Sequence, residues 1–165
     1  MIAVIGCGNA NRTDDGAGLE VIRLLRQSKA ITSRGDVKLL DAGTDGMAVM
    51  FAACGCTSLI LVDCCKTGAD PGATFEVPGE DLESPHQPSL NLHDFRWDHA
   101  IYAGRQIYRD SFPKDVTAFL IEGFSLELGC GLTADIRDAA EKVAVRIEAR
   151  IAAIAETVAD AISLP

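Results

Sequence analysis

Short apolar runs, polar loops that contain glycine, and helical patterns follow one another repeatedly along this chain, and this alternation limits the folds open to it. The first apolar run, residues 2–5, leads through the loop GCGNANRTDDGAG into an amphipathic helical pattern over 16–27. The second, DVKLLD at 36–41, leads through AGTDG into the small-residue pattern MAVMFAA at 47–53. Strands that alternate with helices form a mostly parallel sheet through right-handed crossovers. We therefore predict an α/β fold, a three-layer sandwich with helices on both faces of a twisted sheet.

The rest of the pattern completes a sheet of about five strands. The other predicted elements are a central strand at 57–62, an edge strand at 73–77 that is read as antiparallel, a helix at 93–108, a strand at 115–121 and a long helix at 133–162, with allowance for one interruption. Ligands of such sheets bind at the carboxyl ends of the strands, where the strand order reverses. If the order begins 2-1-3, the loop that holds Asp14 and Asp15 approaches Asp63, which directly follows the central strand.

Length, charge and cysteine content restrict the class of protein. The 165 residues suffice for one hydrophobic core, so we predict a single domain over 1–165. A net charge of −9 argues against nucleic acid or an anionic membrane as partner. No apolar run approaches the roughly 18 residues of a membrane span, and no secretory leader is visible. We therefore expect a cytoplasmic monomer, whose six cysteines are free thiols.

The first loop begins like a dinucleotide-binding fingerprint but departs from it. Asn11 occupies the position of the third glycine, and the following helix begins too late for a pyrophosphate to reach its N-terminus. Asp41 ends the second strand, where a ribose-binding acid would stand, yet a carboxylate there is also an ordinary turn residue. The chain has no GK[ST] phosphate-binding signature. Nucleotide binding is therefore only a secondary hypothesis.

Oxygen and nitrogen ligands for a metal ion are predicted at the same edge of the sheet. They are a first-loop carboxylate, Asp63 and a histidine, a mixture that Ni, Zn and Co accept. The first-loop carboxylate, Asp14 or Asp15, could instead only cap the following helix. His93 begins a predicted helix, and His99 points about 240° away from it around the axis. These two histidines are therefore not expected to share an ion.

Four of the six cysteines stand in two close pairs, Cys54 with Cys56 and Cys64 with Cys65, which raises the question of a zinc site. If the run between the pairs is one strand, Cys56 and Cys64 lie eight steps of about 3.3 Å apart, too far to share an ion. Cys7, Cys64 and Cys65 fall near the predicted site. We interpret them as small buried thiols, because a nucleophilic cysteine would need a histidine base beside it.

Five motifs, taken in order, resemble those of the hydrogenase maturation endopeptidases. They are GCGNANRTDDGAG after the first strand, DAGTDGM at 41–47, LILVD ending at Asp63, LHDF at 92–95 and GLT at 131–133. The resemblance covers nearly the whole chain and implies a phosphorylase/hydrolase-like sandwich. It also implies a cytoplasmic peptidase that removes a C-terminal extension from the large-subunit precursor of a nickel-iron hydrogenase after nickel insertion.

The same resemblance implies the residues of the site. Carried onto this chain, the catalytic and metal-contacting residues are Asp15, Asp63 and His93. Asp15 stands where the family commonly has a glutamate, and its neighbour Asp14 is the alternative. His86, in the sequence SPHQ, is the alternative to His93.

A glycine-threonine turn is implied to influence substrate choice. It comprises Gly43, Thr44, Asp45 and Gly46, with Asp41 before it. The expected partner is the nickel-loaded large-subunit precursor, which presents the nickel, and we expect no tightly bound cofactor of the protein's own. Either the nickel activates the attacking water or carbonyl, or an aspartate such as Asp41 or Asp63 acts as the base. A metal-dependent chaperone that holds the precursor without cutting it is the alternative function.

Overall fold

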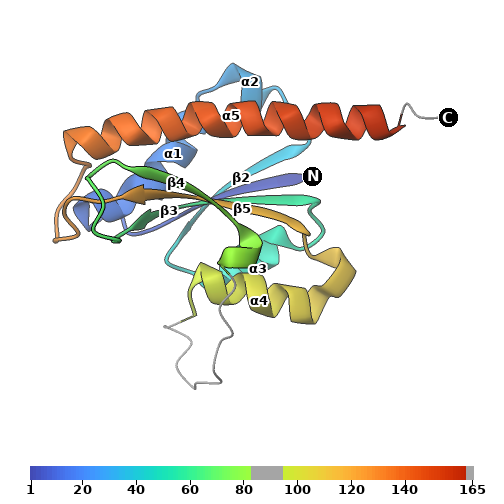
Figure 1. Ribbon diagram of the computed structural model, residues 1–165, viewed down its shortest axis with the longest axis horizontal. Helices are drawn as coiled ribbons and strands as arrows, with labels where there is room; N and C mark the ends of the chain where they lie inside the picture. Colours follow the sequence, from blue (N-terminus) through green and yellow to red (C-terminus); the bar gives the residue numbers. More distant parts are fainter. Residues whose placement is uncertain (83–94, 163–165) are drawn as a thin grey trace.

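The computed structural model of this protein describes residues 1–82 and 95–162, which form a five-stranded sheet between helices on both faces (Figure 1). The strands are β1 (Ile2–Cys7), β2 (Val37–Gly43), β3 (Ser58–Cys65), β4 (Thr74–Pro78) and β5 (Asp115–Glu122). The helices are α1 (Ala17–Leu25), α2 (Lys29–Thr32), α3 (Gly46–Ala53), α4 (Trp97–Tyr108) and α5 (Ala134–Ile162). Short 3-10 turns cover Thr13–Gly16, Gly79–Asp81 and Arg109–Ser111. The predicted three-layer α/β sandwich is confirmed.

The order of the strands is β2-β1-β3-β5-β4. The first four of these pair in parallel, whereas β4 runs antiparallel to β5 at the edge. The prediction of an order that begins 2-1-3 and of an antiparallel edge strand is therefore confirmed. Because the chain crosses from β2 over β1 to β3, the order reverses between β1 and β3, and the carboxyl ends of both strands lie at the left of Figure 1.

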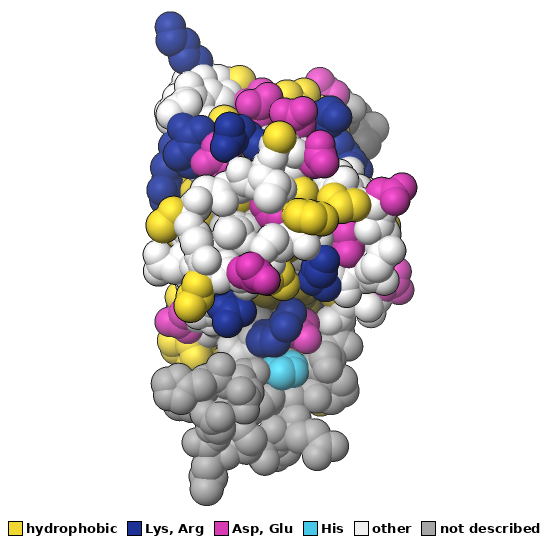
Figure 2. Space-filling view, turned by 90° about the vertical axis from the view of Figure 1, so that its left-hand side faces the viewer, with side chains coloured by type: hydrophobic (Ala, Val, Ile, Leu, Met, Phe, Trp, Pro, Cys, Tyr) yellow, Lys and Arg dark blue, Asp and Glu magenta, His cyan; other side chains and the backbone are white. Residues whose placement is uncertain are grey.

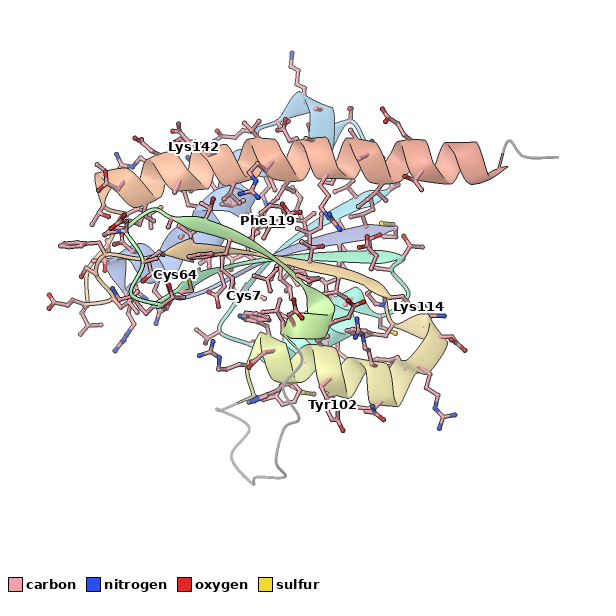
Figure 3. The ribbon with its side chains drawn as sticks, in the orientation of Figure 1. Cys7, Cys64, Tyr102, Lys114, Phe119 and Lys142 are labelled. Carbon is pink, nitrogen blue, oxygen red and sulfur yellow. The ribbon has the colours of Figure 1, made fainter. Side chains whose placement is uncertain are left out.

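Alternate side chains of the sheet enter two separate cores. Ile60 and Phe119 pack with α1 and α5 on one face, whereas Leu61 and Ala118 pack with α3 and α4 on the other. Figure 3 shows Phe119 on the α5 side, where the guanidinium of Arg146 lies 5.1 Å from the centre of its ring. Each large aliphatic side chain buried in this way stabilises the fold by about 1.5–3 kcal/mol. Two hydrophobic cores, one on each face, therefore fix the sheet and hence the position of the carboxyl ends of its strands.

Glycine lets α1 lie unusually close to the sheet. A Cβ at Gly18 would stand 2.3 Å from the carbonyl oxygen of Cys7 and 2.4 Å from that of Val62. A Cβ at Gly6 would meet the carbonyl oxygen of Gly18 at 2.4 Å. Gly6 and Gly18 therefore allow the close contact between helix α1 and the sheet.

Among the element boundaries that differ from prediction, two bear on the site. The central strand ends at Cys65 rather than at 62, because its last three residues continue to pair with β5 beyond the end of β1. Helix α4 begins at Trp97 rather than at 93, since Phe95 and Arg96 precede it in non-helical conformation. Asp63 consequently lies within β3, not after it.

Helix α5 runs without a break for 29 residues, so the interruption that we allowed for is absent. Its apolar side chains, among them Ile136, Ile147 and Ile151, are buried against the sheet and α1. Neither α5 nor any other helix in the described part of the chain is long and apolar enough to cross a bilayer. The assignment of residues 1–165 to a single domain stays a prediction.

Candidate functional site

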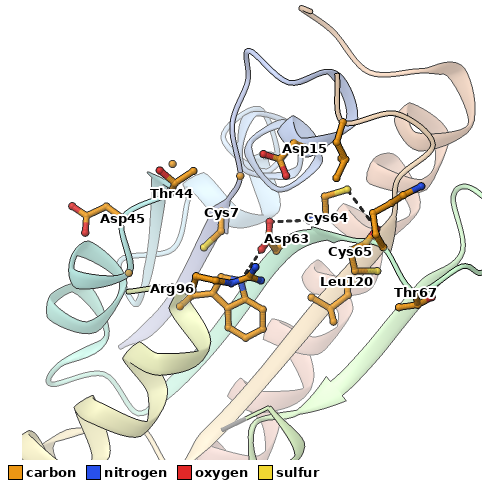
Figure 4. A pocket seen from close by; sticks show the side chains of 16 residues that line it. Cys7, Asp15, Thr44, Asp45, Asp63, Cys64, Cys65, Thr67, Arg96 and Leu120 are labelled. Carbon is orange, nitrogen blue, oxygen red and sulfur yellow. Dashed lines mark hydrogen bonds between the residues drawn. The ribbon is translucent and has the colours of Figure 1, made fainter. Parts of the chain in front are cut away.

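A cavity of about 510 Å³ opens at the carboxyl ends of β1 and β3 (Figure 4). The first loop, the turn between β2 and α3, the end of β3 and the start of α4 all contribute to its lining. The residues predicted for the site that line it are Asp15, Asp63, Gly43, Thr44, Asp45 and Gly46. Figure 2 looks onto this end of the molecule, where acidic and basic side chains intermingle. The predicted meeting of the first loop with Asp63 is thus present in the structure.

Asp15 presents its side chain to the cavity from the first loop (Figure 4). The loop turns through the 3-10 segment Thr13–Gly16, and Asp15 Oδ2 accepts a hydrogen bond of 3.1 Å from the backbone N–H of Asn9. The side chain is half-buried, and among the described residues this is the one hydrogen bond that its carboxylate accepts, which leaves lone pairs for a ligand. Of the two adjacent acids, Asp15 is therefore the one available to a ligand.

Asp14 points away from the cavity into the loop between β5 and α5. Its carboxylate is fully buried and accepts backbone N–H bonds from Phe124 at 3.0 Å, Ser125 at 2.9 Å and Thr133 at 2.7 Å. The hydroxyl of Thr133 donates a fourth bond to it at 3.1 Å. Asp14 therefore ties two loops together. Neither it nor any other side chain caps α1 or the 3-10 turn, so the capping alternative is wrong.

Asp63 lies in the middle of the lining, on β3, with only 8% of its surface exposed. Its Oδ1 accepts from the backbone N–H of Cys64 at 2.8 Å, and its Oδ2 accepts from the indole Nε1 of Trp97 at 2.6 Å. Burial raises the pKa of Asp63 to about 6, and the negative charge of Asp15 acts in the same direction. The two hydrogen bonds and Arg96 lower this pKa but do not offset the burial. Asp63 is therefore ionised at neutral pH, but its surroundings stabilise the negative charge less well than water does.

Gly8 lies between the backbone of Asp15 and the carboxylate of Asp63, where a side chain would not fit. Its φ of +124° is one that side chains rarely adopt. A Cβ at this position would stand 1.8 Å from the carbonyl oxygen of Asp15 and 3.6 Å from Oδ1 of Asp63. The absence of a side chain at Gly8 thus lets the first loop fold back toward β3.

Three thiols, those of Cys7, Cys64 and Cys65, line the cavity beside Asp63, as the sequence predicted (Figure 4). Burial, followed by the charge of Asp63, raises the pKa of Cys7 well above its usual value. Burial first, together with nearby carboxylates, likewise raises the pKa values of Cys64 and Cys65 to about 12. These thiols are therefore protonated at neutral pH, which argues against a thiolate nucleophile. All six cysteines of the chain are free.

The turn between β2 and α3 forms one rim of the cavity. Asp45 caps α3, because its side chain accepts from the backbone N–H of Ala48 at 3.0 Å. Gly43 has a positive φ of 53°, and its carbonyl oxygen accepts from the backbone N–H of Gly8 at 2.8 Å. Asp41 differs from the rest: it is exposed, accepts from the N–H of Gly43, and lines a second cavity rather than this one.

Of the three histidines, only His99 lies within the described residues, and it does not line the cavity. His86 and His93, the two alternatives for the third ligand, both lie outside the described residues. His99 lies within α4, partly buried, with its ring 6.1 Å from that of Phe95. Within residues 1–82 and 95–162, no group of three or more His, Cys, Asp or Glu side chains is placed to hold a metal ion. Asp15 and Asp63 thus offer two carboxylates at one cavity.

Sequence reasoning missed three basic or aromatic residues of the lining. The indole of Trp97 donates a hydrogen bond to Asp63. Arg96 directly precedes Trp97 and α4, and Lys66 directly follows β3. The ammonium of Lys66 donates to the carbonyl oxygens of Gly123 at 2.9 Å and Phe124 at 3.3 Å. A tryptophan directly after the histidine-containing stretch was a signal in the sequence, but its partner on another element was not.

Glu122, at the end of β5, is a further carboxylate that the sequence analysis passed over. It is 1% exposed and accepts from the backbone N–H groups of Thr67, at 2.8 Å, and Gly68, at 3.0 Å. The hydroxyl of Thr67 donates another bond of 2.8 Å. These donors hold the pKa of Glu122 well below its ordinary value, the backbone bond from Thr67 having the largest effect. Glu122 therefore fixes the loop after β3, from which Thr67 reaches the cavity lining.

Several known proteins are similar to this chain in sequence and fold. The family profile described as hydrogenase maturation protease matches residues 19–150. The chain is 26% identical over 162 residues to hydrogenase 2 maturation protease of Escherichia coli (strain K12), which covers 98% of this chain and 94% of that protein. The solved structure of the hydrogenase maturating endopeptidase HybD from E. coli is similar with a TM-score of 0.74 at 25% identity, covering 94% of this chain and 93% of that one. The [NiFe] hydrogenase maturation protease HycI from Thermococcus kodakarensis KOD1 has the same fold, with a TM-score of 0.67 at 21% identity and 89% of each chain covered.

Proposed function

This chain belongs to the hydrogenase maturation proteases, and from that premise we propose that it removes the C-terminal extension of a nickel-iron hydrogenase large-subunit precursor once nickel has been inserted. The precursor brings the nickel, so that the metal is part of the substrate. Asp15, Asp63 and His93 contact it. Docking of the metal then reports that the precursor is loaded and holds the scissile peptide beside the cavity.

The observation that carries this proposal is the pair of carboxylates, Asp15 and Asp63, on one cavity. Burial of Asp63 leaves it a poorly compensated anion at neutral pH, and the charge of Asp15 adds to the local negative potential. A divalent cation relieves both charges at once. Nickel accepts carboxylate oxygen together with imidazole nitrogen, which is the ligand set proposed here.

Cleavage requires activation of the attacking water or the scissile carbonyl, a base, and recognition of the substrate, and we propose a group for each role. Nickel can polarise the scissile carbonyl or lower the pKa of an attacking water. Where the metal only orients the peptide, Asp63 can accept the proton, because of the two aspartates considered as the base it lines the cavity and Asp41 does not. The turn from Gly43 to Gly46 forms the rim over which the precursor enters, and we assign it to substrate recognition.

The proposal includes where and in what form the protein acts. We propose a cytoplasmic monomer whose partner is the nickel-loaded large-subunit precursor. Six free cysteines support a reducing compartment, since disulfides form and persist in oxidising ones.

The experiment is an incubation of the purified protein with nickel-loaded and nickel-free precursor, followed by intact mass measurement of the precursor. Loss of the C-terminal peptide from the loaded form alone is the expected result. Cleavage of both forms at equal rates overturns nickel sensing. A precursor that is bound but keeps its full length identifies the protein as a metal-dependent chaperone instead.

A further inference from the structure

Within residues 1–82 and 95–162, each oxygen of the Asp63 carboxylate accepts one hydrogen bond. Oδ1 is held by the backbone N–H of the next residue, Cys64, which any residue in this strand would provide. Oδ2 is held by the indole of Trp97, which comes from another element, 34 residues further along the chain. Each carboxylate oxygen offers about two lone pairs, so one direction per oxygen remains open to a ligand. The orientation of those open directions depends on what holds Oδ2.

The Trp97 indole is itself rigidly held. The residue is the first of α4, only 8% of its surface is exposed, and it packs in the same core as Ala100 and Ile101. An indole N–H can donate but never accept, so that it pairs only with an oxygen that accepts. At 2.6 Å the contact with Asp63 is short, as expected for a bond to a charged acceptor. A packed donor of this kind fixes a carboxylate more sharply than water could.

The start of α4 also touches the recognition turn. A Cβ at Gly46 would stand 2.2 Å from the carbonyl oxygen of Phe95 and 2.7 Å from that of Arg96. The backbone just before Trp97 therefore lies directly against the last residue of the turn that we assign to substrate recognition. The 95–97 segment thus contacts Gly46 through the backbone of Phe95 and Arg96 and Asp63 through the Trp97 indole.

We propose that Trp97 is a positioning residue: its indole N–H fixes the Asp63 carboxylate so that the open lone pairs meet the nickel of the precursor, and it links that carboxylate to the 43–46 turn. The inference rests on the proposed function, in which Asp63 contacts nickel. Trp97 is also the single tryptophan of the chain, so its fluorescence reports directly on this site.

The single tryptophan allows an experiment that changes one atom group. Growth of a tryptophan auxotroph on benzothienylalanine replaces the indole N–H by sulfur at residue 97 alone, and Trp97→Phe is the genetic counterpart. Ni²⁺ binding to each folded protein is measured by calorimetry, and cleavage of the nickel-loaded precursor gives kcat/KM. We expect the dissociation constant for Ni²⁺ to rise and kcat/KM to fall by about 10- to 100-fold, the usual effect of removing a group that orients a metal ligand. In the unmodified protein we expect Ni²⁺ to quench the emission of Trp97.

Two variants make the outcome decisive. Ile101→Ala perturbs the same helix and core without touching Asp63, and it is expected to lower thermal stability while keeping the Ni²⁺ affinity and kcat/KM. Asp63→Asn is expected to lose Ni²⁺ binding, quenching and cleavage. If the benzothienyl protein keeps normal affinity and rate while Asp63→Asn loses both, the role of Trp97 is overturned and the proposed function stands. If Asp63→Asn itself binds Ni²⁺ and cleaves normally, the part of the proposed function that makes Asp63 a nickel contact is overturned, and the role of Trp97 with it; if neither the parent nor any variant cleaves the loaded precursor, the proposed function itself is overturned. Should Trp97→Phe not fold, the benzothienyl protein decides alone.

Discussion

Glu122 and Asp63 are two buried carboxylates near the same end of the sheet, and their surroundings are opposite. Glu122 is 1% exposed and receives two backbone N–H bonds and a hydroxyl bond from the Thr67–Gly68 loop. Asp63 is 8% exposed and receives one backbone and one indole N–H. The pKa of Glu122 lies well below its ordinary value, whereas burial raises that of Asp63 to about 6.

The difference separates a structural carboxylate from one kept for a ligand. The charge of Glu122 is stabilised by hydrogen bonds from the Thr67–Gly68 loop, which occupy its carboxylate oxygens. Few of its lone pairs therefore remain for a cation. Asp63 faces a cavity, has another carboxylate, Asp15, nearby, and keeps part of its coordination open. Perturbed pKa values gather at functional sites, but the direction of the shift indicates which of the two buried acids the site uses.

The strongest test of this contrast is the effect of Asp63→Asn on cleavage. The amide keeps the shape of the side chain but removes its charge, and one of its ends can no longer accept from Trp97 or Cys64. We expect the rate of precursor processing to fall by roughly 1,000-fold, as for the loss of a group that acts on the reacting atoms. Initial rates from a gel-shift or mass assay measure this. Asp110→Asn, at a side chain 97% exposed, is the matched control and should cleave normally. Processing by Asp63→Asn within threefold of the parent would contradict the contrast.

A second test uses the pH dependence of stability. The pKa of Asp63 is raised from 3.8 to about 6 by folding, so between these values the folded state holds a proton that the unfolded state has lost. The free energy of unfolding therefore falls as pH rises through this window, by about 3 kcal/mol in total. Asp63→Asn lacks this loss. Denaturant titrations of both proteins at pH 4 and pH 7 should show the variant gaining about 2.4 kcal/mol on the parent over that interval, because at pH 4 the unfolded state already holds part of a proton. A difference that does not change with pH would show that Asp63 titrates normally.

The adjacent acids of the first loop extend the contrast to Asp14 and Asp15. Asp14 resembles Glu122, since four donors hold it, so Asp14→Asn should lower the free energy of unfolding by about 2–3 kcal/mol through unpaired buried groups. Asp15→Asn removes a cavity carboxylate with a single hydrogen bond and should leave stability nearly unchanged while slowing processing by roughly 100-fold. Chemical denaturation and processing assays on the same two preparations measure both effects. Equal effects of the two substitutions on stability would refute the assignment of roles.

The fold and half of this site were predictable from sequence because their signals are local. Alternating strands and helices predicted the sandwich, and an acid directly after the most apolar run predicted Asp63. Glu122 follows the strand at 115–121 with the same local signal. What distinguishes the two is the Thr67–Gly68 loop, more than 50 residues away, which supplies donors to only one of them. Pattern and spacing carry no information on such a contact.

The same limit applies to the first loop and to α4. Asp14 and Asp15 are chemically identical neighbours, and only the 3-10 turn Thr13–Gly16, entered at Thr13 with a φ of 42°, directs one inward and the other to the cavity. Trp97, on α4, bonds to Asp63 on β3, so its role could not be predicted from helical periodicity. The resemblance to the family pointed to Asp15 where the residues alone left both acids open.

The smallest expected effect, Glu122→Gln, tests the structural side of the contrast. The amide presents an N–H₂ group to donors that need an acceptor, so the melting temperature at pH 7 should fall by on the order of 5 °C. Because the pKa of Glu122 is lowered by folding, its contribution to stability is present above the ordinary pKa of 4.5 and is lost as pH falls through the lower folded value. The melting curves of parent and variant should therefore converge on acidification, which is the reverse of the pH dependence expected for Asp63. Glu141→Gln, at an exposed position on α5, should melt like the parent throughout. Processing by Glu122→Gln at 25 °C should stay within about twofold of the parent, because Glu122 holds a loop and does not line the cavity. A large loss of activity in a folded variant would place Glu122 in the site and remove the distinction between the two acids.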